Sequence, residues 1–201
     1  MKLSIMKLFI NSGSPFARKV RIVVREKGLM DQVEEVFVVP VESPSDLVRA
    51  NPLSQIPALI VDGTCWTDSS LIAHWLDALG AEPRLLPEGE AVWPVRRLEV
   101  LGAGLLEMTV KMVLENRRPE SERSPFWLKR WEDNLLRGFA VAETACPAAE
   151  VFDLGSLTLG LAATYADFRY PQIDWRRVAP RVAALQAQLE KRQSFIDTYP
   201  K

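Results

Sequence analysis

Ser14 stands where a helix is expected to begin, and that position could hold an anion. A short apolar run, Met6–Ile10, is followed by the turn residues Asn11-Ser12-Gly13 and then by Ser14-Pro15. Serine is a good N-cap, and proline is favoured at the first helical position. A helix start presents free N–H groups and the positive end of the helix dipole, which together favour an anion. Ser14 is therefore the first candidate to contact such an anion, and Ser12 is the second. The alternative is that Ser14 only caps its helix.

Asp68 and Ser69 form a second candidate site, at the end of a predicted strand and the start of a helix. Ser69 can offer its hydroxyl and its N–H to a carboxylate, while Asp68 can pair with an ammonium group. An ordinary N-cap is the alternative interpretation.

Pro57 directly precedes a predicted strand and offers a third kind of contact. Proline removes a backbone donor and, if its peptide bond is cis, turns the backbone groups of Ile56 outward. We expect Pro57 to be cis, so that an extended peptide can pair with Ile56 as an added strand. Gln55, with its side-chain amide, can bond to peptide groups beside it. A simple loop proline is the alternative.

Strands and helices alternate over residues 6 to 80 in the order βαβαββα. Predicted strands cover residues 6–10, 33–39, 58–61 and 64–67, and the last two flank Asp62-Gly63, a strong hairpin signal. Predicted helices run from Pro15 to Gly28, from about Ser43 to Arg49, and from Ser69 to Gly80. Apolar residues recur at helical spacing in the first helix at Phe16, Val20, Val23 and Val24, and in the third at Ile72, Trp75, Leu76 and Leu79.

The rest of the chain is predicted to be helical. Residues 81–90 hold two prolines, a glycine and three glutamates, which is typical of a linker. Further helices are expected over 91–117, from Ser124-Pro125, from Ser156, and from Pro180 with Val182, Leu185 and Leu189 facing inward. The pattern predicts an α/β domain over 1–80, a linker over 81–90 and an all-helical domain over 91–201.

Composition excludes several classes of protein. The 201 residues carry 25 basic and 26 acidic side chains, so the net charge of −1 gives no reason to expect nucleic acid or a membrane surface as partner. No apolar run approaches the ~20 residues of a membrane span. One histidine and two distant cysteines cannot supply a zinc site, and they argue against a disulfide framework. A cytoplasmic protein without a metal is expected.

Three motifs, in order, resemble those of the glutathione transferase superfamily. Residues 11–22 (NSGSPFARKVRI) resemble its first βα turn, and Ser-Pro-Phe within them resembles the Cys-Pro-Phe of omega-type members, while zeta-type members carry serine at the Ser14 position. Residues 51–59 (NPLSQIPAL) resemble the loop that holds a cis-proline. Asp68-Ser69-Ser70 resembles the acidic-Ser pair that holds the γ-glutamyl end of glutathione. The spacing spans residues 6–80, and the order of elements agrees.

The resemblance implies a thioredoxin-like N-terminal domain followed by an all-helical domain, in a homodimer. It implies that Ser14 holds the thiol of glutathione, the co-substrate, as a thiolate for attack on a small electrophile; isomerisation or dehalogenation are related possibilities. The residues expected to bind glutathione or the electrophile are Gln55, Ile56, Pro57, Asp68, Ser69, Met108 and Met112. The two methionines share one face of the long helix with Leu105, a pattern that core packing also explains.

Two departures and three other function classes bear on this interpretation. Gln55 replaces the lysine of many relatives, and Leu159 replaces an aspartate that completes a capping box begun at Ser156, so that box is expected to be half missing. A non-catalytic adaptor with the same fold is the main alternative. A thiol-disulfide reductase needs a cysteine at Ser14, and a serine hydrolase needs a Gly-x-Ser-x-Gly motif; the chain has neither.

Overall fold

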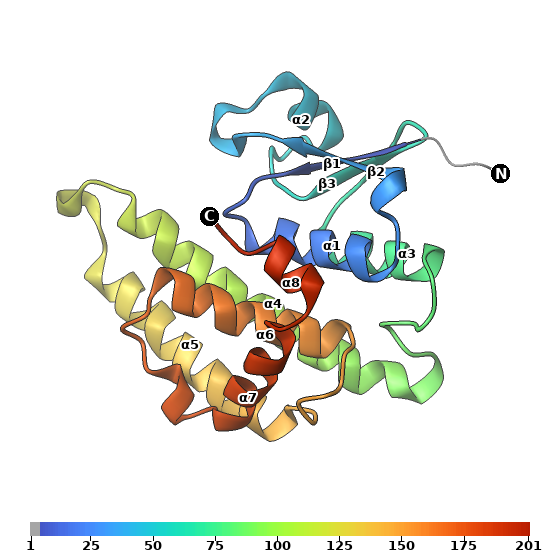
Figure 1. Ribbon diagram of the computed structural model, residues 1–201. Helices are drawn as coiled ribbons and strands as arrows, with labels where there is room; N and C mark the ends of the chain where they lie inside the picture. Colours follow the sequence, from blue (N-terminus) through green and yellow to red (C-terminus); the bar gives the residue numbers. More distant parts are fainter. Residues whose placement is uncertain (1–4) are drawn as a thin grey trace. The chain divides into compact units, whose positions relative to one another are not determined.

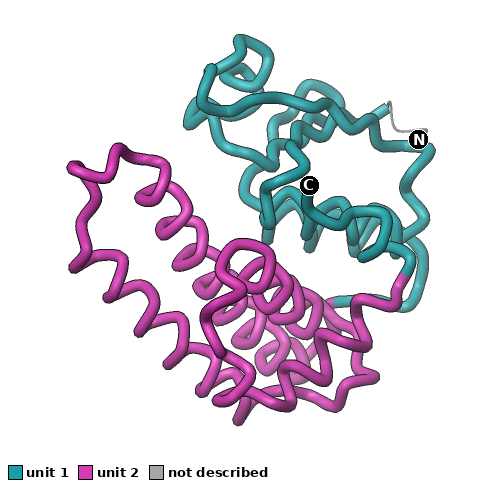
Figure 2. The backbone as a smooth tube through the Cα atoms, turned by 60° about the vertical axis from the view of Figure 1, so that its left-hand side comes forward, with its two compact units in different colours: residues 1–85, 193–201 teal, residues 86–192 magenta. Residues whose placement is uncertain are grey.

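The computed structural model describes residues 5–201, which form two compact units. Of the described residues, unit 1 takes in 5–85 and 193–201, and unit 2 takes in 86–192 (Figure 2). The sequence-based division continued the helical domain to residue 201, whereas in the structure residues 193–201 pack with the first unit. Within residues 5–201, no helix combines the length and the apolar character needed to cross a membrane.

Unit 1 contains the predicted four-stranded mixed sheet. Its strands lie in the order β2-β1-β3-β4, with β1 parallel to β2, β1 antiparallel to β3, and β3 antiparallel to β4. Asp62 and Gly63 both have positive φ, which suits the two-residue turn of the β3–β4 hairpin. The bounds are β1 Met6–Ile10, β2 Val33–Phe37, β3 Ala58–Val61 and β4 Thr64–Trp66, so β2 ends two residues before the predicted Val39.

Helices cover both faces of this sheet and complete the thioredoxin-like order predicted from the sequence. Figure 1 shows α2 on one face, and α1 and α3 on the other. The four helices of unit 1 are α1 Pro15–Glu26, α2 Ser45–Ala50, α3 Ser69–Leu79 and α8 Gln193–Asp197. In α3, Ile72 and Leu76 are buried as expected, whereas Leu79 is exposed and Trp75 is half-buried, stacked on Trp66 of β4.

A buried ion pair joins the far ends of α1 and α3. Lys27 Nζ lies 3.0 Å from Asp77 Oδ1, and both side chains are 0% exposed. Lys27 also donates to the carbonyl oxygen of Pro83 at 2.8 Å, while the Asp77 carboxylate accepts from Leu85 N–H at 2.8 Å and from Arg84 Nε at 3.1 Å. Because every charged atom here has a partner, the pair fixes the C-terminal ends of both helices and the segment that follows α3.

A second ion cluster holds α1 to strand β2. The Glu35 carboxylate accepts from Arg21 Nε at 3.0 Å and from Arg25 Nη1 at 2.8 Å. Burial would raise the pKa of Glu35, but the hydrogen bonds and positive charges of the two arginines outweigh burial and hold that pKa below its ordinary value. Its contribution to stability is therefore present above the pKa of the unfolded chain and is lost as pH falls through the folded value.

Unit 2 is a helical bundle, as predicted. The central helix α6 is buried along almost all of its length and packs closely on α4. The approach is close because Gly102 of α4 has no side chain: a Cβ there would lie 2.9 Å from the backbone of α6. The four helices are α4 Val92–Asn116, α5 Pro125–Ala145, α6 Leu154–Arg169 and α7 Pro180–Leu189. Short 3-10 helices across both units cover Met30–Gln32, Pro40–Glu42, Gly89–Ala91, Glu120–Glu122 and Trp175–Arg177.

The expectation of a half-missing capping box at the third helix of this unit is wrong. The helix begins at Leu154, two residues before Ser156, and its N-cap is Asp153. Asp153 Oδ1 accepts from Ser156 N–H at 2.7 Å, and Ser156 Oγ accepts from Asp153 N–H at 2.9 Å. The box is therefore complete with the acid and the serine in exchanged positions, and Leu159 is free to be a buried core residue.

Replacing Asp77 by asparagine tests the buried ion pair. Asp77→Asn leaves the Lys27 ammonium buried without its charge partner, so we expect the free energy of unfolding to fall by about 3–5 kcal/mol. Urea denaturation followed by circular dichroism measures the loss. Asp46→Asn is the matched control, because Asp46 pairs with Arg49 on the surface, where a pair contributes about 1 kcal/mol or less. A loss at Asp77 no larger than at Asp46 would contradict the assigned role.

Candidate functional site

The start of α1 is built by two side chains that cap the backbone. Gly13 N–H donates to Asn11 Oδ1 at 2.9 Å, which turns the chain after β1. Ser14 is the N-cap in an extended conformation, and its Oγ accepts from Ala17 N–H at 3.2 Å. Pro15, at the first helical position, has no N–H to satisfy. The capping interpretation of Ser14 is therefore correct as far as the fold is concerned.

Ser14 can still donate a hydrogen bond while it caps α1. A hydroxyl has one O–H donor and two acceptor lone pairs, and the cap occupies one lone pair. The O–H remains to donate to a ligand, and Ser14 is half-buried. Capping and anion binding are therefore compatible at this residue. Ser12 is half-buried as well and stays the second candidate.

At the start of α1 and at the start of α3, the cap contacts leave one backbone N–H without a hydrogen-bond partner among residues 5–201. In α1, Pro15 has no N–H, Ala17 donates to Ser14 Oγ, and Arg18 donates to Ser14 O at 3.0 Å. That leaves the N–H of Phe16 with no partner among residues 5–201. A free N–H at the start of a helix favours an anion there.

The start of α3 also keeps one backbone N–H without a partner among the described residues. Asp68 is the N-cap, and its Oδ1 accepts from Ser70 N–H at 3.0 Å and Leu71 N–H at 3.1 Å. Ile72 N–H donates to Asp68 O at 3.0 Å. The N–H of Ser69 then has no partner within the described chain. Asp68 is exposed and Ser69 is buried, so a carboxylate acceptor and a free N–H stand next to each other.

Lys19 of α1 links the start of that helix to the start of α3, and its role was not predicted from the sequence. Its side chain is 1% exposed, and Nζ donates to Ser70 Oγ at 3.1 Å. A buried ammonium group under the first turn of α3 adds positive charge to both helix dipoles, which favours an anion there. The only signal in the sequence was its position, five residues after Ser14.

Pro57 has the cis peptide bond that was predicted, at Ile56-Pro57. The loop is organised by Asn51, whose Nδ2 donates to Gln55 O at 2.9 Å and whose Oδ1 accepts from Leu53 N–H at 3.1 Å. Pro57 is buried, Ile56 is half-buried and the Gln55 side chain is exposed. The backbone N–H and C=O of Ile56 have no hydrogen-bond partner between residues 5 and 201 and are available to an extended peptide.

The methionines of the candidate electrophile site lie on α4 in unit 2. Met112 and Leu105 are each 3% exposed, so both serve as core residues of the helical bundle. Met108 is half-buried, and its Sδ lies 3.9 Å from Asn134 Nδ2 of α5. Of the two methionines, only Met108 keeps an appreciable exposed surface.

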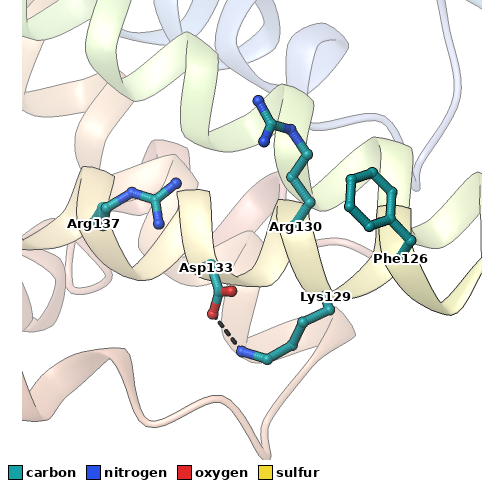
Figure 3. Close-up of a pocket in the computed structure, with 5 residues that line it drawn as sticks. All are labelled: Phe126, Lys129, Arg130, Asp133 and Arg137. Atoms are coloured by element: carbon teal, nitrogen blue, oxygen red, sulfur yellow. Dashed lines mark hydrogen bonds and ion pairs between the residues drawn. The ribbon is translucent and has the colours of Figure 1, made fainter.

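A shallow basic hollow of about 300 Å³ lies on α5 (Figure 3). Lys129 pairs with Asp133, Arg130 lies beside the ring of Phe126, and Arg137 adds a positive charge at the other end of the hollow. This hollow was not predicted from the sequence, because charged residues on an exposed helix face are common. It shares no residue with the helix starts of unit 1, and all of its lining comes from one helix.

Neither cysteine lies at the start of α1, where Ser14 stands. Both are free thiols, and Cys65 is exposed on β4 while Cys146 is buried after α5. Burial raises the pKa of the Cys146 thiol, which disfavours its thiolate at neutral pH. Among residues 5–201, no group of three or more His, Cys, Asp and Glu side chains is placed to hold a metal ion.

Comparison with known proteins agrees with the geometry of unit 1. Residues 13–79 match the family model of the glutathione S-transferase N-terminal domain. A glutathione transferase family member from Pseudomonas fluorescens Pf-5, crystallised with bound glutathione, is 32% identical, covers 98% of this chain and 99% of its own, and superposes with a TM-score of 0.92.

Two other similar proteins come from Escherichia coli and Haemophilus ducreyi. An uncharacterised GST-like protein of Escherichia coli K12, YibF, is 29% identical over 97% of this chain and 98% of its own length. A stringent starvation protein A homologue of Haemophilus ducreyi is 26% identical over 76% of this chain and 71% of its own length. The relatives therefore include proteins whose names state no enzymatic activity.

Proposed function

The chain belongs to the glutathione S-transferase superfamily, and from this premise we propose that it binds glutathione in unit 1 and activates its thiol for attack on a small electrophile. The observation that carries the proposal is the start of α1, where the Ser14 hydroxyl keeps its donor and Phe16 keeps its N–H. Both donors favour a thiolate over a thiol. Isomerisation or dehalogenation would use the same activated thiol.

The energetics of this site are sufficient for thiol activation without a catalytic base. A free thiol has a pKa of about 8.5, and lowering it by ~2 units requires about 2.7 kcal/mol of preference for the thiolate. A hydrogen bond to a charged partner supplies roughly 1.5–3 kcal/mol. The helix dipole adds roughly 0.3–1 kcal/mol. Ser14 and the start of α1 together reach the required amount.

The other contacts of glutathione follow from its chemistry. The Asp68 carboxylate pairs with the ammonium group of the γ-glutamyl end, while Ser69 donates its N–H and hydroxyl to the carboxylate of that end, near the positive charge of Lys19. The peptide groups pair with the backbone of Ile56 beside Pro57, with Gln55 at the exposed edge. Met108, which keeps an exposed surface, is proposed to line the electrophile site, in a cytoplasmic protein that needs no metal.

The second candidate function is that of a non-catalytic adaptor that keeps the fold. The similarity to the stringent starvation protein A homologue favours it. Glutathione binding does not separate the two functions, because an adaptor can retain the pocket. Turnover of a panel of electrophiles does: an enzyme conjugates at least one of them with glutathione faster than the uncatalysed reaction, and an adaptor conjugates none.

Asp68→Asn tests recognition of the γ-glutamyl end. Asparagine keeps the oxygen that caps α3 but loses the charge that pairs with the ammonium group, so we expect at least about tenfold weaker glutathione binding, or ~1.4 kcal/mol. The rise in melting temperature caused by glutathione should shrink accordingly. Asp68→Ala should also lose about 1 kcal/mol of stability without ligand, because it removes the cap. Asp62→Asn, in the hairpin turn, is the control, and an equal response of Asp68→Asn and Asp62→Asn would refute the assignment.

Ser14→Ala tests activation of the thiol. We expect the pKa of bound glutathione to rise by about one unit or more, if the hydrogen bond is worth at least ~1.4 kcal/mol, while glutathione affinity changes little. Turnover should fall near pH 7 and recover at high pH, where any thiol ionises. Loss of the cap should also reduce stability by roughly 0.5–2 kcal/mol. Ultraviolet titration of the bound thiolate separates the two effects, and an unchanged titration would move the role to Ser12 or to backbone N–H groups alone.

We propose further that the protein is a homodimer. Small two-domain chains of this kind commonly associate with twofold symmetry. Sedimentation or light scattering at micromolar concentration should give twice the mass of 22.6 kDa. A strictly monomeric mass over the whole concentration range would refute this.

A further inference from the structure

Residues 193–201, here called the C-terminal strap, lie along α1 within unit 1. The strap begins with α8 and is attached to α1 at two places. Near the end of α1, Ser194 Oγ hydrogen-bonds the Glu26 carboxylate. Nearer its start, Arg18 contacts three residues of the strap. The strap therefore spans most of the length of the helix that Ser14 begins.

Arg18 makes an unusually complete set of contacts for a helix residue. Its side chain is buried, Nη2 donates to Phe195 O at 3.0 Å, and Nε donates to Thr198 Oγ1 at 3.4 Å. The guanidinium also lies 5.4 Å from the ring centroids of both Phe195 and Tyr199. Thr198 is itself buried, and its hydroxyl donates to Ser194 O at 2.7 Å. Planar guanidinium groups suit such forked and stacked contacts, and an ammonium group does not.

Arg18 is joined directly to Ser14. Its backbone N–H donates to Ser14 O at 3.0 Å, which is the first hydrogen bond of α1. Helical side chains tilt toward the N-terminus, so the Arg18 side chain lies over the turn that Ser14 begins. Contacts of the strap with Arg18 therefore restrain the position of Ser14.

We propose that Arg18 is a positioning residue of the glutathione site: it couples the C-terminal strap to the first turn of α1 and so fixes the place of the Ser14 hydroxyl. The inference rests on the proposed function and deepens it. According to this inference, the C-terminal strap supports the part of the site that holds the glutathione thiol, although the strap is far from Ser14 in the sequence.

Arg18→Lys and Thr198→Val test the coupling in the full-length protein. Lysine keeps the positive charge but loses the fork and the stacking, and valine removes the Thr198 hydroxyl while leaving Arg18 unchanged. For both variants we expect the pKa of bound glutathione to rise by about 0.5 unit, which corresponds to an acid dissociation constant about threefold smaller. Ser194→Ala is the matched control: it removes the attachment at the far end of α1 and should lower the melting temperature without moving the titration.

The outcomes are distinguishable from failure of the proposed function. Upward shifts in Arg18→Lys and Thr198→Val, with none in Ser194→Ala, support the positioning role. If Ser14→Ala shifts the titration and these two variants only lower the melting temperature, Arg18 is merely structural and the inference is overturned. If Ser14→Ala leaves the titration unchanged, the thiol is held by Ser12 or by backbone N–H groups, and the inference, which acts through the Ser14 hydroxyl, is overturned although thiol activation is not. Should Arg18→Lys not fold, Thr198→Val decides alone.

Discussion

Unit 1 depends on the buried pair of Lys27 and Asp77. Each charge would be costly alone, and each is compensated by the other and by backbone groups of the segment after α3. The geometry is tight, since a Cβ on Gly80 would lie 2.4 Å from Lys27 Cβ. The pair holds the C-terminal ends of α1 and α3 together, and Lys19 with Ser70 joins them near their starts. Two helices fixed at both ends present their N-termini at one place.

Because α1 and α3 are joined at both ends, the candidate site needs few residues beyond the two helix caps. Each helix start satisfies most of its own N–H groups through a cap, Ser14 in α1 and Asp68 in α3, and leaves one N–H for a ligand. Each of the two helix starts is therefore one hydrogen bond short, and a ligand with suitable acceptor groups would supply the missing bonds. Because both starts carry the positive ends of helix dipoles, they favour anionic groups in such a ligand.

Local signals in the sequence were enough to predict the fold and the candidate residues, and contacts distant in sequence were not. Ser14-Pro15, Asp62-Gly63 and Gly80 act through their own backbone, so the helix and hairpin ends they mark are found where expected. Lys27 and Asp77 could not be foreseen as a pair, because fifty residues separate them and such side chains are normally exposed. The strap was missed for a related reason: α8 has five residues and no readable apolar period. Asp153 was missed because the capping box was sought only after Ser156.

No cysteine stands at the start of α1, where Ser14 caps the helix. Ser14 cannot form a mixed disulfide, Cys146 is buried with a raised thiol pKa, and Cys65 lies on β4 with its Sγ 3.6 Å from Arg49 O. A reductase mechanism therefore has no protein thiol at the helix start. What the chain supplies there is a donor, a free N–H and a helix dipole, all of which stabilise charge and none of which forms a covalent bond. Groups of this kind raise the thiolate fraction of a thiol that is bound beside them.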